Sequence, residues 1–262
     1  MADPVDPIAS ARGPRAVLPK RFYQRAAVAA RDGTFVIVLD GRPLRTPTRK
    51  LVALPDAALA EIVAAEWAGQ GEHIDPATMP VTRIVNSAIE GVAGEMPAVA
   101  DDIVNYAGSD LVCYRAAGPE PLVAEQARAW DPVLDWAREA LGARFVLSEG
   151  VMFVAQSRAA LDAVRTGLMA CTGTSPFRLA GLSVMTTLTG SALIALHCAS
   201  GACSIAKAWA IAHVDEDFQA RMWGSDAEAE ARRAARWREM AAAGSVLGVR
   251  ILRDVSPPDS IQ

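Results

Sequence analysis

The chain has 262 residues, 52% of them hydrophobic, and a formal net charge of −4. This composition is that of a globular protein with a sizeable core, and the acidic balance argues against a nucleic-acid partner. The cysteines are too sparse for a disulfide scaffold, so we expect reduced thiols and a cytoplasmic protein. These cysteines are Cys113, Cys171, Cys198 and Cys203.

The first part of the chain predicts a small α+β domain over residues 21–80, preceded by a disordered tail over residues 1–20 that resembles neither a signal nor a transit peptide. Asp32-Gly33 and Asp40-Gly41 are dipeptides typical of tight hairpin turns between short β-rich runs. A further strand is expected at 50–54, and a helix at 57–70 with Leu59, Ile62, Val63 and Trp67 on one side.

The remainder of the chain predicts a larger, all-α domain over residues 81–246, followed by a tail over 247–262. Its last long helix should begin with a capping box at Ser225 and end at Gly244. The expected helices cover residues 83–92, 99–107, 124–142, 157–173, 205–224 and 225–244.

Residues 179–206 contain no Asp, Glu, Lys or Arg and are long enough to cross a membrane. Polar interruptions and the turn signal at Ser200-Gly201 favour a buried helical hairpin instead, so no membrane insertion is expected.

Most enzyme signatures are absent from the sequence, which contains no phosphate-binding loop, no HExxH and no CxxC. His197 and Cys198 are neighbours that would not face each other on a helix, so they are interpreted as structural. His73 and Asp75 lack further ligands at a metal-site spacing. We therefore expect no nucleotide, metal or other cofactor.

The stretch "HVDEDFQARMWGSD", residues 213–226, collects acids, an amide and a tryptophan. On one helix over 205–224, an apolar stripe of Ile211, Val214, Phe218 and Met222 would face the core. The opposite side would carry Trp209, Glu216, Gln219 and Trp223, a combination typical of protein-binding surfaces.

Two other interpretations of this stretch stay open. The tryptophans could pack under the following helix with Glu216 at their rim. A carboxylate-dependent hydrolase would need Glu216 to act with Asp215 or Asp217, whose side chains should point away from it.

The sequence "DEDFQARMWG" resembles a signature of the assembly chaperones for the F1 sector of ATP synthase that bind the alpha subunit, the mitochondrial F1-ATPase assembly factor 2 type. The segments "RFY" (21–23), "LDGRPLRTP" (39–47) and "EWAGQGEHIDPATMPVTRIVNSAIE" (66–90) resemble the same family in the same order.

This resemblance implies a chaperone without enzymatic activity that keeps the unassembled alpha subunit soluble until the beta subunit pairs with it. It implies a cytoplasmic location for a bacterial member and the mitochondrial matrix for eukaryotic relatives. The alternatives are the hydrolase and an interaction scaffold of unknown partner.

The signatures supply most of the candidate residues; the helical pattern adds Trp209, and Asp215 is included as the neighbour of Glu216. Partner-binding residues are predicted to be Glu216, Gln219, Trp223, Trp209 and Asp215. Residues interpreted as structural are Trp67, Gln70, Pro76, Met79, Pro80, Thr82 and Gly224, with Trp67 packing where the two domains meet.

Overall fold

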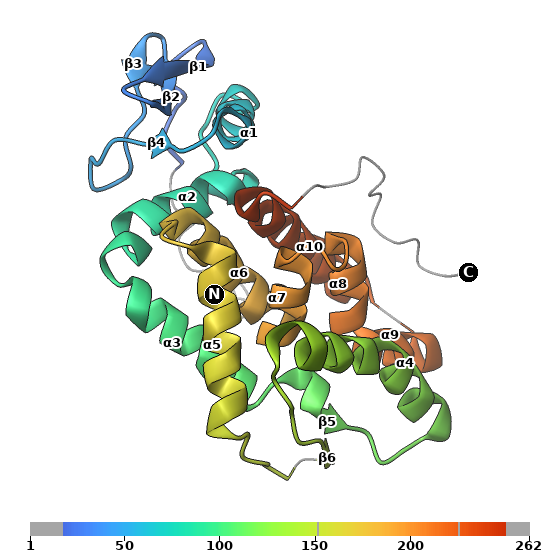
Figure 1. Cartoon of the computed structure of the whole chain (residues 1–262). Coiled ribbons are helices and arrows are strands. Elements are labelled where there is room, and N and C mark those ends of the chain that lie inside the picture. Colours follow the sequence, from blue (N-terminus) through green and yellow to red (C-terminus); the bar gives the residue numbers. More distant parts are fainter. Residues whose placement is uncertain (1–17, 151, 225, 250–262) are drawn as a thin grey trace, which may run out of the picture.

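The structure is a computed structural model that describes residues 18–150, 152–224 and 226–249. A small region of strands with one helix lies at one end of the molecule, and a larger body of helices forms the rest (Figure 1). The predicted α+β class, with strands first and a mostly helical second part, is confirmed.

The strands form a small antiparallel sheet whose turns are those that the two Asp-Gly dipeptides predict. β1 (Ala26–Arg31) pairs with β2 (Thr34–Leu39), which also pairs with β3 (Arg42–Pro43) and β4 (Ala53–Leu54). All four turn residues have positive φ, between +47° and +80°, as a two-residue hairpin loop of this type requires.

Helix α1 (Ala57–Ala68) covers this sheet. The side chain of Asp56 caps its first turn by accepting a hydrogen bond from the backbone N–H of Leu59 at 2.8 Å. Its buried face includes Leu59 and Val63, as predicted, whereas Ile62 is 36% exposed and lies outside that face.

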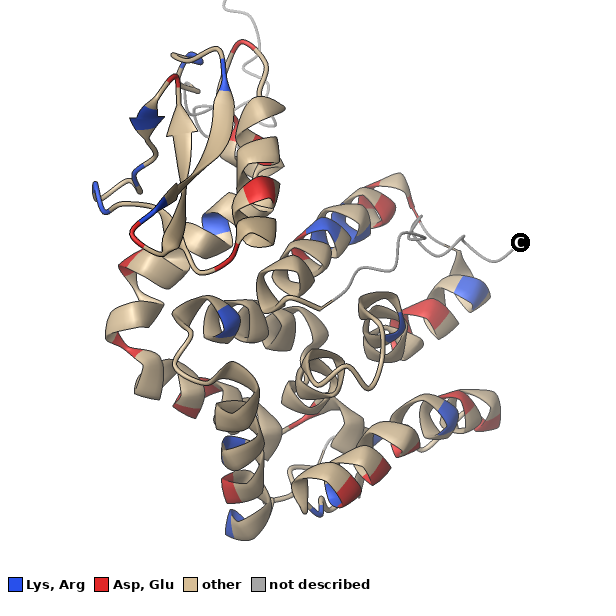
Figure 2. Ribbon diagram, turned by 45° about the horizontal axis from the view of Figure 1, so that its top comes forward, with Lys and Arg blue, Asp and Glu red and all other residues tan. Residues whose placement is uncertain are grey.

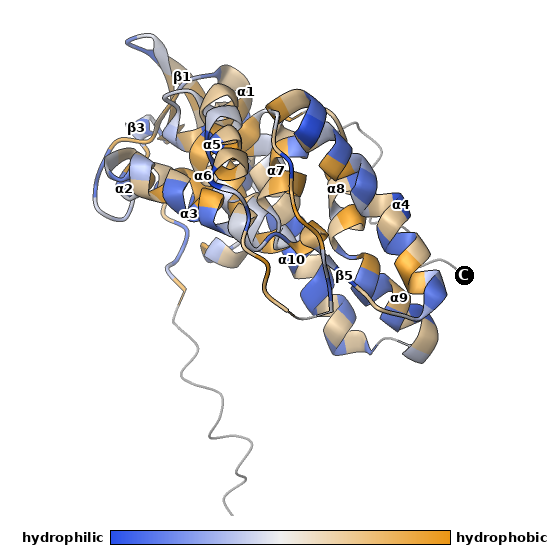
Figure 3. Cartoon of the chain, turned by 60° about the horizontal axis from the view of Figure 1, so that its bottom comes forward, coloured by the Kyte–Doolittle hydropathy of each residue, from blue (hydrophilic) through white to orange (hydrophobic). Residues whose placement is uncertain are grey.

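Nine α-helices follow in the described residues, and α6 and α7 lie inside the bundle, where hydrophobic residues gather (Figure 3). Charged residues instead lie on the outer helices and loops (Figure 2). The helices are α2 (Pro80–Glu90), α3 (Met96–Gly108), α4 (Glu120–Trp136), α5 (Arg158–Thr172), α6 (Pro176–Thr189), α7 (Ala192–Ala199), α8 (Ile205–Ala212), α9 (Val214–Trp223) and α10 (Ala227–Leu247).

The charge-free segment 179–206 forms the greater part of α6, all of α7 and the start of α8. The expected turn is present at Gly201, with φ +82°, and a second turn, which was not predicted, lies at Gly190, with φ +66°. Within the described part of the chain, no helix is both long and apolar enough to span a membrane.

Helix α10 differs from its prediction at both ends. Its N-cap is Asp226, which accepts a hydrogen bond from the N–H of Ala229 at 2.7 Å, whereas Ser225 lies outside the described residues. The helix continues past Gly244 because this glycine is a packing position: a Cβ there would lie 2.1 Å from the Cδ1 of Ile205 on α8. It ends instead at Gly248, whose φ is +73°.

A buried polar cluster joins α1 to α2, where the sequence placed a domain boundary. The Glu66 carboxylate accepts hydrogen bonds from the N–H of Val81 at 2.8 Å, the N–H of Thr82 at 2.7 Å and the Thr82 hydroxyl at 2.6 Å. The amide of Gln70 donates to Thr78 at 3.0 Å and accepts from the N–H of Asp75 at 2.7 Å. The connector is therefore fixed by side chains.

The other signature residues of this connector also have structural positions. Pro76 begins a short 3₁₀ turn, Met79 is buried in the core, and Pro80 begins α2. Trp67 is half-buried, and its ring contact is with Tyr23, at 5.6 Å between centroids. Both residues of that contact belong to the N-terminal region. The placement of Trp67 between the two domains therefore stays a prediction.

The ordered chain begins before residue 21, where the predicted tail should end. The carbonyl of Pro19 accepts a hydrogen bond from the N–H of Ile74 at 2.8 Å, and Lys20 forms a β-bridge with His73. The rest of the predicted N-terminal tail, residues 1–17, and residues 250–262 of the C-terminal one lie outside the described residues.

A fully buried carboxylate, Asp110, ties the chain after α3 to the N-terminus of α7. Its two oxygens accept hydrogen bonds from the N–H of Leu193 at 3.0 Å and of Val112 at 3.3 Å. Burial raises the pKa of Asp110 to about 6, although these hydrogen bonds oppose the rise. The ionised form is therefore disfavoured by the fold.

We expect Asp110 to make stability depend on pH in a particular direction. Because its folded pKa is raised, its contribution is complete below the unfolded pKa and is lost as the pH rises through about 6. Between pH 5 and pH 7, the stability advantage of the wild type over Asp110→Asn should shrink by about 1 kcal/mol. Urea unfolding of both proteins at the two pH values measures this, and an advantage that grows with pH would contradict it.

Candidate partner-binding surface

The predicted helix over 205–224 is two helices. His213 separates them with φ −113° and ψ 22°, so that α8 ends at Ala212 and α9 starts at Val214. A break of this kind changes the direction of the axis, and residues on either side of it no longer share one face. The pattern that grouped Trp209 with residues of α9 therefore does not apply.

Trp209 is a core residue, and its prediction as a partner-binding residue is wrong. Its side chain is only 1% exposed. The indole packs against the His213 ring at 3.8 Å and, edge to face, against Trp237 of α10 at 5.5 Å. The interpretation in which a tryptophan packs under the next helix is thus correct for Trp209.

Helix α9 lies at the edge of the bundle, next to α4 (Figure 1), and has no fully buried residue. The predicted core stripe holds for Ile211, which is buried on α8, and partly for Val214 and Phe218, which are half-buried. Met222 was predicted to face the core, yet it is 61% exposed. Apolar burial alone therefore does not position α9.

Polar contacts on two sides hold α9 instead. Toward α4, the buried side chain of Gln126 donates a hydrogen bond to the Asp215 carboxylate at 2.8 Å, and Arg221 forms an ion pair with Glu125. Toward α10, Asp217 forms an ion pair with Arg233 at 2.6 Å. Asp215 and Asp217 diverge from Glu216 as predicted, but the Asp215 carboxylate is engaged within the chain, which argues against a role in partner binding.

Glu216 lies between these ties and is exposed. Among the described residues, none forms a hydrogen bond or salt bridge with its carboxylate. Arg233 is paired with Asp217, while Arg236 donates a hydrogen bond to the carbonyl of Leu188 at 2.8 Å. The neighbouring arginines therefore have other partners, and the Glu216 carboxylate is left to interact with groups from outside.

Two grooves flank Glu216. The first, of about 510 Å³, runs between α9 and α10, and the second, of about 460 Å³, runs between α9 and the C-terminal end of α6. Both are lined by His213, Glu216 and Arg236, and Gln219 lines the second. Glu216 thus stands on the ridge between two hollows.

His213 lies beneath this ridge, lines both grooves and is buried. Its Nδ1 lies 2.8 Å from the carbonyl oxygen of Trp209. Burial lowers the pKa of His213 below its ordinary value, and the nearby arginines lower it further, against the opposing effect of Glu216. The surroundings of the ring therefore favour its neutral form beside the Glu216 carboxylate.

The C-terminal end of α9 carries a projecting apolar tip, which we define as Met222 and Trp223. Trp223 is 85% exposed, the highest exposure among the large hydrophobic side chains of the described residues. Gly224 ends the helix with φ +81°, a conformation suited to glycine, and lines the first groove. The sequence pattern assigned Met222 to the core stripe because it follows Phe218 by one helical turn, but at this end of α9 the side chain is exposed.

The other candidate chemical residues have structural surroundings. Cys198 is buried, and Asp75 caps a 3₁₀ turn by accepting a hydrogen bond from the N–H of Ala77 at 2.9 Å. In residues 18–150, 152–224 and 226–249, no group of three or more His, Cys, Asp or Glu side chains could hold a metal ion.

Comparison with known proteins identifies the family. The family model of the ATP12 chaperone protein matches residues 20–138. The crystal structure of Atp12 from Paracoccus denitrificans matches this chain with a TM-score of 0.80 and 39% sequence identity. The match covers 88% of this chain and 98% of that one. The chain belongs to the ATP12 chaperone family.

Two further relatives agree with this assignment to the ATP12 family. The crystal structure of the Atu1473 protein from Agrobacterium tumefaciens matches this chain with a TM-score of 0.84 and 50% sequence identity. The match covers 88% of this chain and 86% of that one. The mitochondrial protein atp12 of Schizosaccharomyces pombe is 22% identical over 218 residues, which are 79% of this chain and 74% of that one. The ATP12 family match at 20–138 does not include Glu216 or Trp223.

We expect alanine substitutions of Trp209 and Trp223 to have very different effects on the free energy of unfolding of this ATP12 family member. Trp209→Ala should lower the free energy of unfolding by about 3–5 kcal/mol because it removes a fully buried indole. Trp223→Ala should change it by less than about 0.5 kcal/mol because the indole is exposed. Chemical denaturation monitored by circular dichroism measures both, and equal losses would show that Trp223 is part of the core.

Proposed function

We propose that this protein is a molecular chaperone of ATP synthase assembly that binds the unassembled F1-ATPase alpha subunit and keeps it soluble until the beta subunit pairs with it. The observation that carries the proposal is the Glu216 carboxylate, which has no hydrogen bond or salt bridge to any described residue and lies on a ridge between two grooves of about 510 and 460 Å³. We define the partner surface as Glu216, Gln219, Met222 and Trp223.

The exposed tip of α9 supplies the apolar part of this surface. An unassembled subunit of a ring exposes an apolar interface that aggregates unless it is covered. Tryptophan and methionine are enriched at protein interfaces, and tryptophan is frequent among the residues that contribute most binding energy. Met222 and Trp223 are exposed at 61% and 85%, as anchors for such an interface would be.

The Glu216 carboxylate supplies the directional part. A charge without an internal partner is hydrated in the free protein and forms an ion pair with a basic group when a partner docks. Charges at the rim of an interface contribute mainly to the association rate and to orientation. Glu216 would therefore select a basic group on the alpha subunit. Gln219 lines the second groove and would form hydrogen bonds with the part of the alpha subunit that docks there.

Family membership supports the same function. Relatives named Atp12 come from Paracoccus denitrificans and, as a mitochondrial protein, from Schizosaccharomyces pombe. By this relationship we assign the chain a chaperone role rather than an enzymatic one, in the cytoplasm of a bacterium. The diverging acids of α9 give no pair of carboxylates for the hydrolase alternative.

The experiment is co-expression with the alpha subunit. Glu216→Lys should reduce the soluble alpha subunit and raise the Kd about tenfold, because the new charge repels the basic group of the partner. Trp223→Ala should have a similar effect through loss of apolar contact. Asp102→Lys is the matched control, since it reverses an exposed charge on α3, away from α9 (Figure 1), and should behave like the wild type.

Circular dichroism confirms that each variant is folded before the comparison is made. Folded Glu216→Lys and Trp223→Ala variants that keep the alpha subunit soluble as well as wild type would show that another surface binds it. If wild type does not capture the alpha subunit at all, the proposed partner is wrong.

A further inference from the structure

Cys198 and Cys203 face each other across the turn between α7 and α8. The turn is closed by hydrogen bonds from the N–H of Gly201 to the carbonyl of Cys198 at 2.9 Å and from the N–H of Ala202 to the carbonyl of His197 at 3.1 Å. Only four residues separate the two cysteines along this closed turn, and each thiol has the largest effect on the pKa of the other. Both cysteines are free, so the turn holds a reduced pair of neighbouring thiols.

The two thiols have different surroundings. Cys198 is completely buried at the end of α7, whereas Cys203 is half-buried and directly precedes Ser204, the N-cap of α8. The positive end of a helix dipole favours a thiolate at that position. Lys207, one turn into α8, adds a positive charge on the same side.

The electrostatics follow from this arrangement. The hydrogen bond with Cys198 lowers the pKa of Cys203 to about 5, and His197 and Lys207 contribute in the same direction. The hydrogen bond with Cys203 and burial raise the pKa of Cys198. Both effects favour the thiolate on the half-buried Cys203 and the proton on the buried Cys198.

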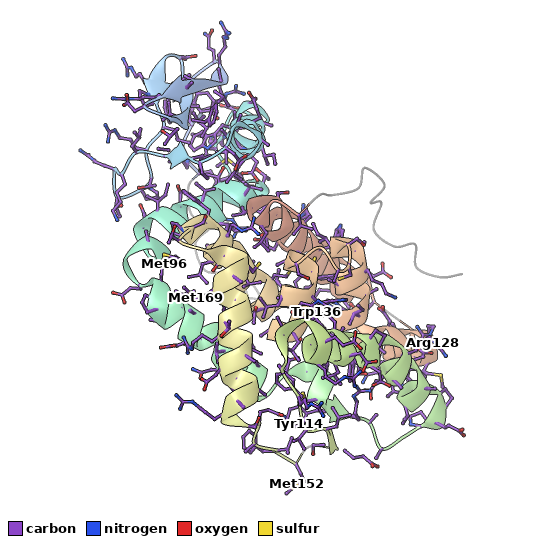
Figure 4. All side chains as sticks on the ribbon, in the orientation of Figure 1. Met96, Tyr114, Arg128, Trp136, Met152 and Met169 are labelled. Carbon is purple, nitrogen blue, oxygen red and sulfur yellow. The ribbon has the colours of Figure 1, made fainter. Side chains whose placement is uncertain are left out.

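His197 is held in place beside this pair. Its ring packs against the indole of Trp136, which is labelled in Figure 4, with 5.1 Å between centroids. It lowers the pKa of Cys203. The Nδ1 atom of the ring is buried without a hydrogen-bond partner. The imidazole is thus fixed where it can stabilise a negative charge on the Cys203 sulfur.

We propose that Cys203 and Cys198 form a redox-active dithiol, which a hydroperoxide converts into a reversible intrachain disulfide. This goes beyond the proposed chaperone function and does not depend on it. The resting pair is reduced, which agrees with the free cysteines, and oxidation uses contacts that the fold already provides.

The chemistry balances in two steps. The Cys203 thiolate attacks one oxygen of the peroxide, the O–O bond breaks, and the products are a sulfenic acid and, after protonation of the leaving oxygen, water or an alcohol. The Cys198 sulfur then attacks the Cys203 sulfur, the S–O bond breaks, and a second water leaves with the Cys198 proton. Two thiols lose two electrons to the peroxide, and a dithiol reductant reverses the bond by exchange.

The remaining cysteines provide controls within the same molecule. Cys171 is also half-buried, yet no second cysteine lies next to it on the chain. Cys113 is fully buried, and burial raises its pKa to about 12. We therefore expect Cys203 to react first and neither control residue to form a disulfide.

The test treats the full-length protein with hydrogen peroxide, blocks free thiols with iodoacetamide and analyses tryptic peptides without reduction. One peptide, residues 179–207, contains both Cys198 and Cys203, whereas Cys113 and Cys171 lie in peptides 84–115 and 166–178. Peptide 179–207 should lose two hydrogens, escape alkylation and become fully alkylated after dithiothreitol. The two control peptides should remain alkylated.

Two variants separate the roles of the sulfurs, with circular dichroism confirming that each is folded. Cys198→Ser should stop at the sulfenic acid, or proceed to higher oxides, on Cys203. Cys203→Ser should leave Cys198 reduced, because its thiol is protonated and buried. In alkylation at pH 6, Cys203 should react faster than Cys171, because Cys203 lies just before the N-terminus of α8 and near Lys207.

Several outcomes would overturn the proposal. They are equal oxidation of Cys171 and Cys203, a disulfide between two chains in place of the intrachain bond, and a peptide 179–207 that keeps both thiols after peroxide has oxidised exposed methionines such as Met152. None of these results bears on capture of the alpha subunit, so the two proposals fail independently.

Discussion

The half-buried carboxylate of Glu66 links the strand region to the helical body. It accepts three hydrogen bonds from the first turn of α2, where backbone N–H groups have no partner within the helix. Burial raises the pKa of Glu66, and the hydrogen bonds from Thr82 and Val81 work against this rise. Since α2 packs against α6 and α10, this one side chain links the sheet and α1 to the centre of the bundle.

Local signals explain which features were predictable from the sequence. The Asp-Gly turns depend on backbone conformation at two adjacent residues, and helix faces depend on a periodicity within one element, so both could be read directly. Gly244 shows the limit. A glycine near the end of a helical pattern resembles a stop signal, but here it allows Ile205 of another helix to approach, which is information that only the tertiary structure contains.

The candidate site was predicted in part for the same reason. Glu216, Gln219 and Trp223 are exposed on α9, where the pattern placed them. Trp209 was misplaced because the break at His213 is marked by neither glycine nor proline, and its cover, Trp237, lies on a helix distant in sequence. The hydrogen bond that Gln126 donates to Asp215 could not be predicted either, since 89 residues separate the two side chains.

The manner in which α9 is attached also determines how this surface responds to its solution. The interior helices are held by apolar burial, which simple salts at moderate concentration change little, whereas α9 relies in part on the ion pairs Arg221–Glu125 and Asp217–Arg233, whose side chains are 32–40% exposed. Ionic strength screens such pairs over a Debye length of about 8 Å at physiological salt. The attachment of the ridge that carries Glu216 is therefore more sensitive to salt concentration than the packing of the interior helices.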